Sequence, residues 1–355
     1  MIRRFRVSNF RCLETAELEF GPDFNLVYGV NASGKTSLLE ALAYLGRGKS
    51  FRGASISHLI RHGESEFVRF GETETETRTQ RLGVRNSRDG LEVRVDGSAE
   101  GGAAALADAL PLQVVDPEVH NLVAGGPELR RRFLDWIAFH VEHDHLDAWR
   151  RFRRALKQRN AALRSRATAA SIRSWNAEFV ELGLALDESR RRSLERSITS
   201  LAQYGLELLG TELGFEYQQG WADGRGLDQA LDEGLERDLQ QGATQHGPHR
   251  ADLRIRYDER QARRLVSRGQ QKLLATAMIL AATDTAQTAL ERPLLLLLDD
   301  PAAELDADSL SRLLGAVSGL GCQVVATSLE RGALALPGGT TVFHVEHGCL
   351  RPEPA

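Results

Sequence analysis

Residues 29–36 have the types and spacing of a phosphate-binding loop. They match the pattern G-x-x-x-x-G-K-[ST] and lie between a predicted strand and a predicted helix. Glycines allow the backbone to turn tightly, so successive N–H groups can point at phosphate oxygens. In this pattern Lys35 reaches the β- and γ-phosphates of ATP, and the hydroxyl of Thr36 binds Mg²⁺. The predicted nucleotide-binding residues are Gly29, Val30, Asn31, Ala32, Ser33, Gly34, Lys35 and Thr36.

Two carboxylates follow the most apolar run of the chain. Residues 294–298 are all leucine, typical of a strand buried in a parallel sheet, and Asp299 and Asp300 come directly after them. Ligands bind at the carboxyl ends of the strands in open α/β sheets. We expect Asp299 to hold Mg²⁺ through water and Asp300 to polarise the attacking water, so Asp300 and Lys35 are the predicted catalytic residues.

A third element precedes a helical segment with an apolar stripe, and it consists of Ser267, Arg268, Gly269 and Gln270. Helix N-termini bind anions, so this element is a second candidate phosphate site. Because one phosphate loop serves one nucleotide, the second site suggests contact with the γ-phosphate held by another copy of the protein. The alternative is that Ser267 only caps its helix, as serine commonly does.

The elements that must position these residues alternate between strands and helices. The apolar patterns predict strands at 2–7, 18–20, 24–28, 112–115, 252–257, 294–298, 323–327 and 341–345. They predict helices after Thr36 and at 270–283 and 307–318. A β-hairpin region is expected over 66–97, and a flexible stretch over 97–105.

Residues 127–213 differ in kind from the rest of the chain. They are dense in arginine, poor in glycine and apolar at helical spacing, which predicts two or three helices. The glycine- and acid-rich stretch 212–244 is expected to be a loop or a small sheet edge. The chain is therefore predicted to be an α/β protein whose head, 1–116 and 244–355, is split by an inserted and mostly helical lobe, 117–243.

Composition places the chain among globular proteins. It has 355 residues, of which 42% are hydrophobic and 26% charged, and its net charge is −4. No apolar run approaches the roughly 20 residues that cross a bilayer, and the first residues show no signal-peptide core, so we expect a cytoplasmic protein without membrane contact. Lysine is rare: the four in the sequence are Lys35, Lys49, Lys157 and Lys272.

These motifs resemble the ATP-binding-cassette (ABC) head domains of the SMC-like group and, within it, the RecF family of bacterial recombination mediators. SMC heads carry hundreds of coiled-coil residues between their two halves, whereas the insertion here is about a hundred residues without sustained heptads, which favours RecF. The strings that carry the resemblance are 9–13, 46–52, 126–136, 149–160, 244–253 and 267–272.

The resemblance implies an ABC-type P-loop ATPase head with a mixed sheet and flanking helices. It implies a homodimer with two ATP molecules between the heads, and it gives the motifs roles. Residues 29–37, including Ser37, would be Walker A; Asp299 and Asp300 would be Walker B; residues 303–306 would be the D-loop. Ser267, Arg268, Gly269 and Gln270 would be the signature acting on the partner's γ-phosphate. Gln113 would touch Mg²⁺ or its water.

The resemblance also implies a function. The ATP-bound dimer would clamp duplex DNA near single-strand gaps and, with the RecO and RecR mediators, load the RecA recombinase during repair. A weak, DNA-stimulated ATPase would then release the clamp.

Three positions depart from the cassette pattern. Asp300 stands where most cassette ATPases have glutamate, and its shorter side chain fits slow turnover. The histidine expected at the end of the last core strand is absent, and Thr327 and Ser328 stand there instead. Arg268 replaces the usual glycine at the second signature position and has the chemistry to reach phosphate itself.

Two alternative functions and one open surface remain at this point. A transporter-type ABC subunit would share the same three motifs, and a scaffold that binds ATP without hydrolysing it would fit Asp300. In the helical lobe Arg150, Arg153, Arg154 and Lys157 share one helix face. That face either contacts the DNA backbone or is a solvated surface paired with nearby acids.

Overall fold

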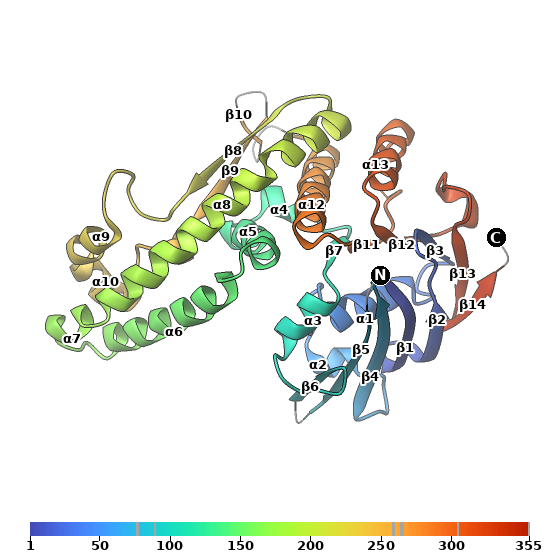
Figure 1. Ribbon diagram of the computed structural model, residues 1–355, viewed down its shortest axis with the longest axis horizontal. Helices are drawn as coiled ribbons and strands as arrows, with labels where there is room; N and C mark the ends of the chain where they lie inside the picture. Colours follow the sequence, from blue (N-terminus) through green and yellow to red (C-terminus); the bar gives the residue numbers. More distant parts are fainter. Residues whose placement is uncertain (76–77, 89, 258–259, 263–265, 304, 354–355) are drawn as a thin grey trace. The chain divides into compact units, whose positions relative to one another are not determined.

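The computed structural model divides the chain into two compact units (Figure 1). Unit 1 consists of Met1–Val119 and Thr276–Ala355, and unit 2 of His120–Ala275. The structure describes residues 1–75, 78–88, 90–257, 260–262, 266–303 and 305–353. The predicted D-loop residue Glu304 and parts of the predicted hairpin region, 76–77 and 89, lie outside these ranges.

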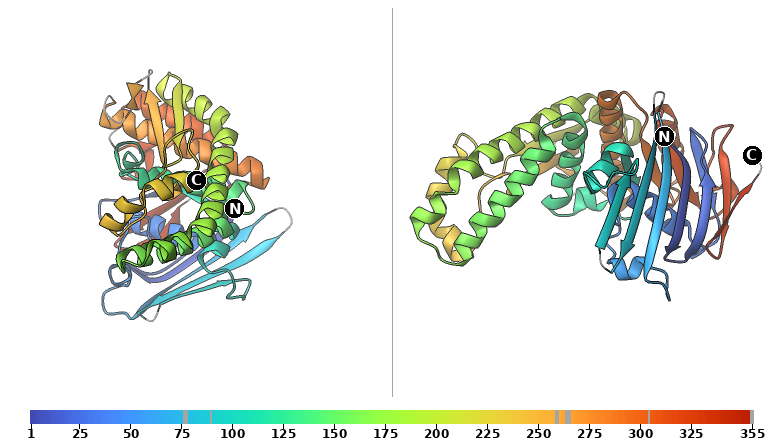
Figure 2. Two further views of the ribbon diagram at one scale, coloured as in Figure 1. Left: turned by 90° about the vertical axis from the view of Figure 1, so that its left-hand side faces the viewer. Right: turned by 60° about the horizontal axis from the view of Figure 1, so that its bottom comes forward.

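Unit 1 contains an antiparallel sheet with the strand order β2-β1-β4-β5-β6, visible as one layer in Figure 2. Its strands are β1 (Ile2–Phe10), β2 (Leu13–Glu19), β4 (Glu66–Glu74), β5 (Thr79–Ser87) and β6 (Gly90–Val95). Buried and exposed residues alternate along much of β4 and β5, as in a sheet with one face on the core and one in solvent.

The second sheet of unit 1 is mixed and has the order β14-β13-β3-β12-β11-β7. Its strands are β3 (Phe24–Tyr28), β7 (Leu112–Val115), β11 (Leu295–Leu298), β12 (Gln323–Ser328), β13 (Thr341–Glu346) and β14 (Cys349–Glu353). All neighbours run parallel except β13 and β14, so the ends of β3, β11 and β12 meet at one edge. The predicted nucleotide-binding residues lie at that edge.

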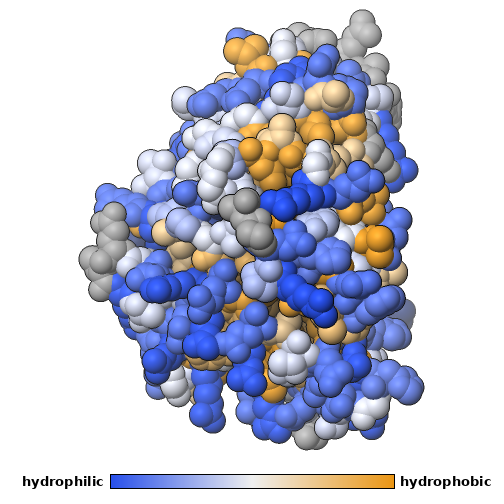
Figure 3. All heavy atoms as spheres, turned by 90° about the vertical axis from the view of Figure 1, so that its right-hand side faces the viewer, coloured by the Kyte–Doolittle hydropathy of each residue, from blue (hydrophilic) through white to orange (hydrophobic). Residues whose placement is uncertain are grey.

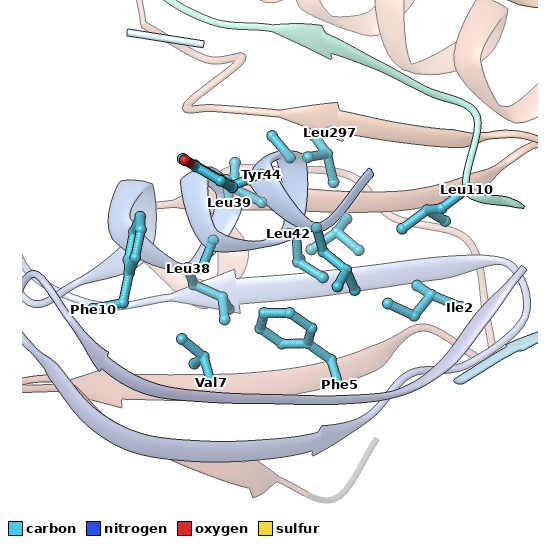
Figure 4. Close-up of a cluster of buried hydrophobic side chains, with 14 of the residues drawn as sticks. Ile2, Phe5, Val7, Phe10, Leu38, Leu39, Leu42, Tyr44, Leu110 and Leu297 are labelled. Atoms are coloured by element: carbon cyan, nitrogen blue, oxygen red, sulfur yellow. The ribbon is translucent and has the colours of Figure 1, made fainter. Parts of the chain in front are cut away.

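Helix α1 (Lys35–Arg47) lies between the two sheets of unit 1. Leu38 and Leu42 lie on the side of the helix that faces Phe5 and Val7 of β1, and Leu39, together with Leu297 of β11, belongs to the same buried cluster (Figure 4). Ten of its residues are buried, which explains why its apolar positions surround much of the helix. The packing on both sides fixes the helix that follows the phosphate loop. The shorter helices of this unit are α2 (Ile56–Leu59), α3 (Ala103–Ala109), α13 (Ala307–Gly319) and η2 (Arg331–Ala333).

Unit 2 is mostly helical. Its longest helix, α8 (Asn176–Leu209), packs against α5 (Pro127–Val141) and α6 (His145–Arg164), and a small antiparallel sheet has the order β10-β9-β8. The strands are β8 (Leu213–Gln218), β9 (Asp252–Tyr257) and β10 (Arg260–Gln261). The remaining short helices are α4 (Asn121–Ala124), α7 (Ala169–Arg173), α9 (Leu227–Glu233), α10 (Leu235–Gln241) and η1 (Pro248–Arg250).

Helix α12 (Arg268–Leu290) begins in unit 2 and ends in unit 1. Within the described residues it is the one helix long and apolar enough to cross a membrane by length and composition alone. Because 72% of its most apolar window is buried in the protein, these features are those of a core helix.

The predicted fold class is confirmed: the molecule is an α/β protein with a mixed sheet, flanking helices and an inserted helical part. The compact units divide at other positions than the predicted segments, because 244–275 belongs with the helical part. Strand β9 pairs with β8, and Arg130 of α5 holds Asp252 at 2.7 Å, so this segment joins the unit that contains its partners.

The face drawn in Figure 3 is predominantly hydrophilic, with apolar patches between the hydrophilic side chains. Two of the four lysines are buried: Lys35 is 8% exposed and Lys272 is 2% exposed. Lys49 and Lys157 are exposed.

Candidate nucleotide site

The phosphate loop occupies the turn between β3 and α1. Strand β3 is buried until Tyr28, and Gly34 begins the helix by accepting a hydrogen bond from the N–H of Leu38 at 2.9 Å. Ala32 and Gly34 both have positive φ, 62° and 119°. A side chain at Gly34 would be strained at this φ and would meet Cys12 Sγ at 3.2 Å, so the loop requires glycine there.

Lys35 folds back over this loop. Its Nζ donates to the carbonyl oxygens of Gly29 at 2.6 Å and Val30 at 2.9 Å. Burial lowers the pKa of the ammonium group, and the nearby Asp300 and Asp299 carboxylates partly oppose that shift. The group therefore stays inside the loop, close to both predicted Walker B acids.

Asp299 is held by two hydroxyl groups. Thr36 Oγ1 and Thr327 Oγ1 each donate to Asp299 Oδ1 at 3.0 Å. The side chain is 5% exposed, and burial raises its pKa while the two hydroxyls oppose the shift. Thr36 and Asp299 are 263 positions apart in the sequence, so the fold joins the two predicted motifs directly.

Asp300 follows β11 in a strained conformation. Its φ is 49°, in the left-handed region that disfavours residues other than glycine. Its backbone N–H donates to Thr327 Oγ1 at 2.9 Å. The turn at Asp300 thus ends the parallel ladder beside the phosphate loop.

The residues present fit ATP and Mg²⁺. The buried hydroxyl of Ser33 has no hydrogen-bond partner among the described residues, as expected of a group that awaits a ligand oxygen. A hydroxyl and a carboxylate, Thr36 and Asp299, are the oxygen donors that Mg²⁺ prefers. Val30, Asn31 and Ala32 form an exposed rim, and Ser37 is half-buried in the first turn of α1.

Gln113 is placed differently from these residues. Gln113 pairs with Leu296 in the middle of the β7–β11 ladder. Leu296 of β11 lies three residues before Asp299. The Oε1 of Gln113 accepts a hydrogen bond from Arg47 at 3.1 Å. In this conformation its hydrogen bond therefore goes to the end of α1 rather than to Thr36 and Asp299.

The predicted signature lies at the start of α12 in unit 2. Ser267 Oγ accepts the N–H of Gln270 at 3.3 Å, and Gln270 Oε1 accepts the N–H of Ser267 at 2.9 Å. This reciprocal arrangement is a capping box, so the expected helix cap is present. Ser267, Arg268 and Gln270 are exposed and Gly269 is half-buried, which leaves the element accessible to a second molecule.

The sequence prediction did not include Asp116 among the site residues. Asp116 directly follows β7, just as Asp299 directly follows β11, and burial raises the pKa of its carboxyl group. An acid directly after a buried strand was the signal that could have indicated it. Arg52 lies near enough to Asp299 to oppose the raised pKa of that carboxyl group. The sequence placed Thr327 at the end of its strand, but no local pattern predicts the hydrogen bond from its hydroxyl to Asp299.

The chain is similar to the proteins of one family. Residues 1–348 match the family model described as the RecF/RecN/SMC N terminal domain. The DNA replication and repair protein RecF of Chromohalobacter salexigens is 41% identical over 99% of both chains. That of Thioalkalivibrio sulfidiphilus is 39% identical over the same shares.

Solved structures show the same fold. The chain is similar to the recombination mediator protein RecF-ATP of the RecFOR pathway, with a TM-score of 0.90 and 24% identity over 99% of this chain and 97% of that one. It is also similar to an Smc head bound to the C-winged helix domain of ScpA, with a TM-score of 0.60 and 15% identity over the same shares.

Proposed function

The chain belongs to the RecF family within the RecF/RecN/SMC group, and from this premise we propose that it is an ATP-dependent DNA-binding protein of recombinational repair and replication. The observation that carries the proposal is the contact between the two nucleotide motifs, Thr36 Oγ1 to Asp299 Oδ1 at 3.0 Å. Family membership sets aside the transporter-type alternative, which the motifs alone left open.

In the proposed site the phosphate loop binds the triphosphate, and Lys35 exchanges its loop carbonyls for phosphate oxygens. Thr36 and Asp299 hold Mg²⁺, which when bound neutralises phosphate charge. Gln113 would have to leave Arg47 to join them. Asp300 orients and polarises the attacking water, and because aspartate is shorter than glutamate, slow hydrolysis is expected.

The proposed active form is a homodimer. Ser267, Arg268, Gly269 and Gln270 of one copy would close on the γ-phosphate held by the other, with the D-loop 303–306 beside them. One observation supports this: the side chains of Ser267, Arg268 and Gln270 are exposed at a helix N-terminus, where the helix dipole favours anions. ATP then acts as the link between two copies.

Helix α6 supports DNA as the partner. Its exposed basic side chains are Arg150, Arg151, Arg153, Arg154, Lys157 and Arg164. Within the described part of the chain, Arg151 is the only one of these with an acidic partner, Asp147 at 3.7 Å, and Arg153 stacks on Trp149. The arginines of α8 are instead neutralised: Arg190 by Asp135, Arg191 by Asp187, and Arg192 and Arg196 by Glu142. Unpaired positive charge on one exposed face favours a phosphate backbone over a solvated ion-pair surface.

The proposed cellular role follows the family. The ATP-bound dimer would clamp duplex DNA near single-strand gaps in the cytoplasm and, with RecO and RecR, promote RecA loading. Weak, DNA-stimulated hydrolysis would release it. Asp300 also favours a second candidate, a scaffold that binds ATP without hydrolysing it, and phosphate release measured with and without DNA distinguishes the two.

Sedimentation velocity with a slowly hydrolysed ATP analogue, with and without a gapped duplex, tests the proposal. We expect a shift from monomer to dimer with the analogue and co-sedimentation of the dimer with the duplex. A protein that stays monomeric when saturated with both contradicts it.

A further inference from the structure

Thr327 lies level with the Walker B acids on the neighbouring strand. Strands β11 and β12 are parallel, with Leu298 opposite Ala326, so the next residues, Asp299 and Thr327, come side by side as the strands end. Thr327 is fully buried, at 0% exposure. It occupies the position where the resemblance led us to expect a histidine.

The hydroxyl of Thr327 contacts both acids at once. It accepts the backbone N–H of Asp300 at 2.9 Å and donates to Asp299 Oδ1 at 3.0 Å. A hydroxyl has one hydrogen and two lone pairs, so both bonds form together. The carbonyl oxygen of Leu298 is a more distant acceptor, at 3.5 Å.

These two bonds fix features that the proposed reaction needs. Asp300 has a φ of 49°, a conformation that persists only where surrounding contacts hold it, and the bond to Thr327 is such a contact. On the other side, Asp299 Oδ1 receives hydrogens from Thr327 and Thr36. Because the Thr36 hydrogen points at Asp299, its lone pairs remain available for Mg²⁺.

We propose that Thr327 is a positioning residue, whose hydroxyl sets the orientation of the magnesium-binding carboxylate of Asp299 and of the water-polarising Asp300 relative to one another. This inference rests on the proposed ATPase function and deepens it. Thr327 acts through the two aspartates and touches neither nucleotide nor metal itself.

Three variants test the proposal: Thr327→Val, which keeps the shape and removes the hydroxyl; Thr327→Ser, which keeps the hydroxyl; and the control Thr283→Val. Thr283 is also fully buried in unit 1, but its hydroxyl bonds the Ile279 carbonyl of its own helix at 2.8 Å. The measurements are steady-state kcat and KM for ATP, and binding of a fluorescent ATP analogue as Mg²⁺ is titrated or removed with EDTA.

For Thr327→Val we expect kcat to fall about 100-fold, the scale of a misplaced catalytic group. The apparent Mg²⁺ affinity in the binding titration should fall about tenfold, as when a partner of a metal ligand is removed. Binding in EDTA should be unchanged, because the phosphate loop is intact. Thr327→Ser should restore most of both quantities, and Thr283→Val should behave as wild type.

A Thr327→Val protein with wild-type kcat and Mg²⁺ dependence overturns the inference while leaving the proposed function standing. Failure of Thr327→Ser to restore them also overturns it, since side-chain volume rather than the hydroxyl would then be responsible. If the valine variant does not fold, Thr327→Cys is measured in its place, and we expect the same decreases in kcat and in apparent Mg²⁺ affinity. A wild-type protein that binds no nucleotide overturns the proposed function and this inference together.

Discussion

A single ammonium group occupies the phosphate loop. Lys35 is mostly buried and donates to two carbonyl oxygens, and burial lowers its pKa. Neutral acceptors satisfy it less well than charged ones, because hydrogen bonds between ionised groups are stronger. An incoming triphosphate therefore gains a stronger bond from a cation that the loop already holds in place.

Replacing Lys35 with methionine removes this cation while keeping an unbranched side chain. We expect ATP affinity to fall by roughly 100-fold, the upper range for a lost charged hydrogen bond, and ATP-dependent dimers and DNA retention to disappear with it. Titration with a fluorescent ATP analogue and sedimentation measure both. Lys157→Met, on the exposed face of α6, is the control for ATP binding, and an unchanged affinity in Lys35→Met contradicts the assignment.

A second residue-scale prediction concerns the stability of unit 2. His145 is 3% exposed, and burial lowers its pKa to about 4. The unfolded chain binds this proton below about pH 6.5 and the folded chain only below about pH 4, so the free energy of unfolding decreases as pH falls through this window. The expected loss from His145 between pH 7 and pH 5 is about 2 kcal/mol.

Urea unfolding followed by tryptophan fluorescence measures this effect, because all four tryptophans, Trp136, Trp149, Trp175 and Trp221, belong to unit 2. In the variant His145→Gln the decrease between the two pH values should be smaller by about 2 kcal/mol. An identical pH dependence in both proteins would show that His145 titrates normally in the folded state.

The sequence predicted some residues of the candidate site but not the contacts between them. Lys35, Thr36 and Asp299 sit in short motifs whose chemistry is local. The bonds that join Thr36 and Thr327 to Asp299 depend on strand register across hundreds of positions, and no local pattern encodes register. Gln113 illustrates the same limit, since its place in the ladder and its bond to Arg47 follow from pairing in three dimensions.

At the scale of elements, the long and strongly patterned segments were predictable. The predicted strand 24–28 is β3 as observed, and the predicted helix 307–318 is α13 but for one residue. Over 212–244, however, the expected loop or sheet edge contains β8, α9 and α10. Helices of seven residues are too short for the spacing of their apolar residues to reveal a helical period. They form here because Leu227, Leu231 and Leu235 are buried against other helices.

The charge on α6 leads to a prediction for DNA binding. Reversing Arg153 and Lys157 together to glutamate should weaken duplex binding and reduce the slope of log affinity against log salt by about 2, since each lost phosphate contact contributes roughly 0.9. Fluorescence anisotropy at several salt concentrations measures the slope.

The charge-matched control for that experiment is Arg173→Glu with Arg225→Glu. These exposed arginines of unit 2 already pair with Asp232 and Glu233, and exposed pairs add little stability. A salt slope that changes equally in both double variants, or in neither, would assign the α6 charges to a solvated surface.

At the scale of the whole molecule, two compact units share one chain that passes between them twice. The predicted phosphate loop and the two predicted Walker B acids lie in unit 1, whereas the predicted signature lies in unit 2 at the start of α12. The sequence predicted an inserted lobe, but not that 244–275 would join it, since that depends on β9 pairing with β8. Nucleotide chemistry and the proposed contact to a second copy are thus carried by different units.

If the proposed function is correct, this separation should allow one mutation to affect hydrolysis without preventing dimer formation. We expect Asp300→Asn to retain ATP-driven dimerisation while hydrolysis falls at least about 100-fold, as for loss of a general base. Dimers formed with ATP should then dissociate more slowly than those of wild type, which sedimentation after dilution into ADP measures. Asp23→Asn, at an exposed position before β3, is the control, and rapid dissociation of Asp300→Asn dimers contradicts the catalytic assignment of Asp300.

The scarcity of lysine has a practical consequence. With Lys35 and Lys272 buried, the side-chain amines open to reagents are Lys49 and Lys157, one in each unit. A bifunctional amine-reactive linker of defined length could therefore join Lys49 of one unit to Lys157 of the other only when the two amines lie within its length. Comparing its cross-linking yield with and without ATP would report any change in spacing between the units, in a protein that needs no engineered labels.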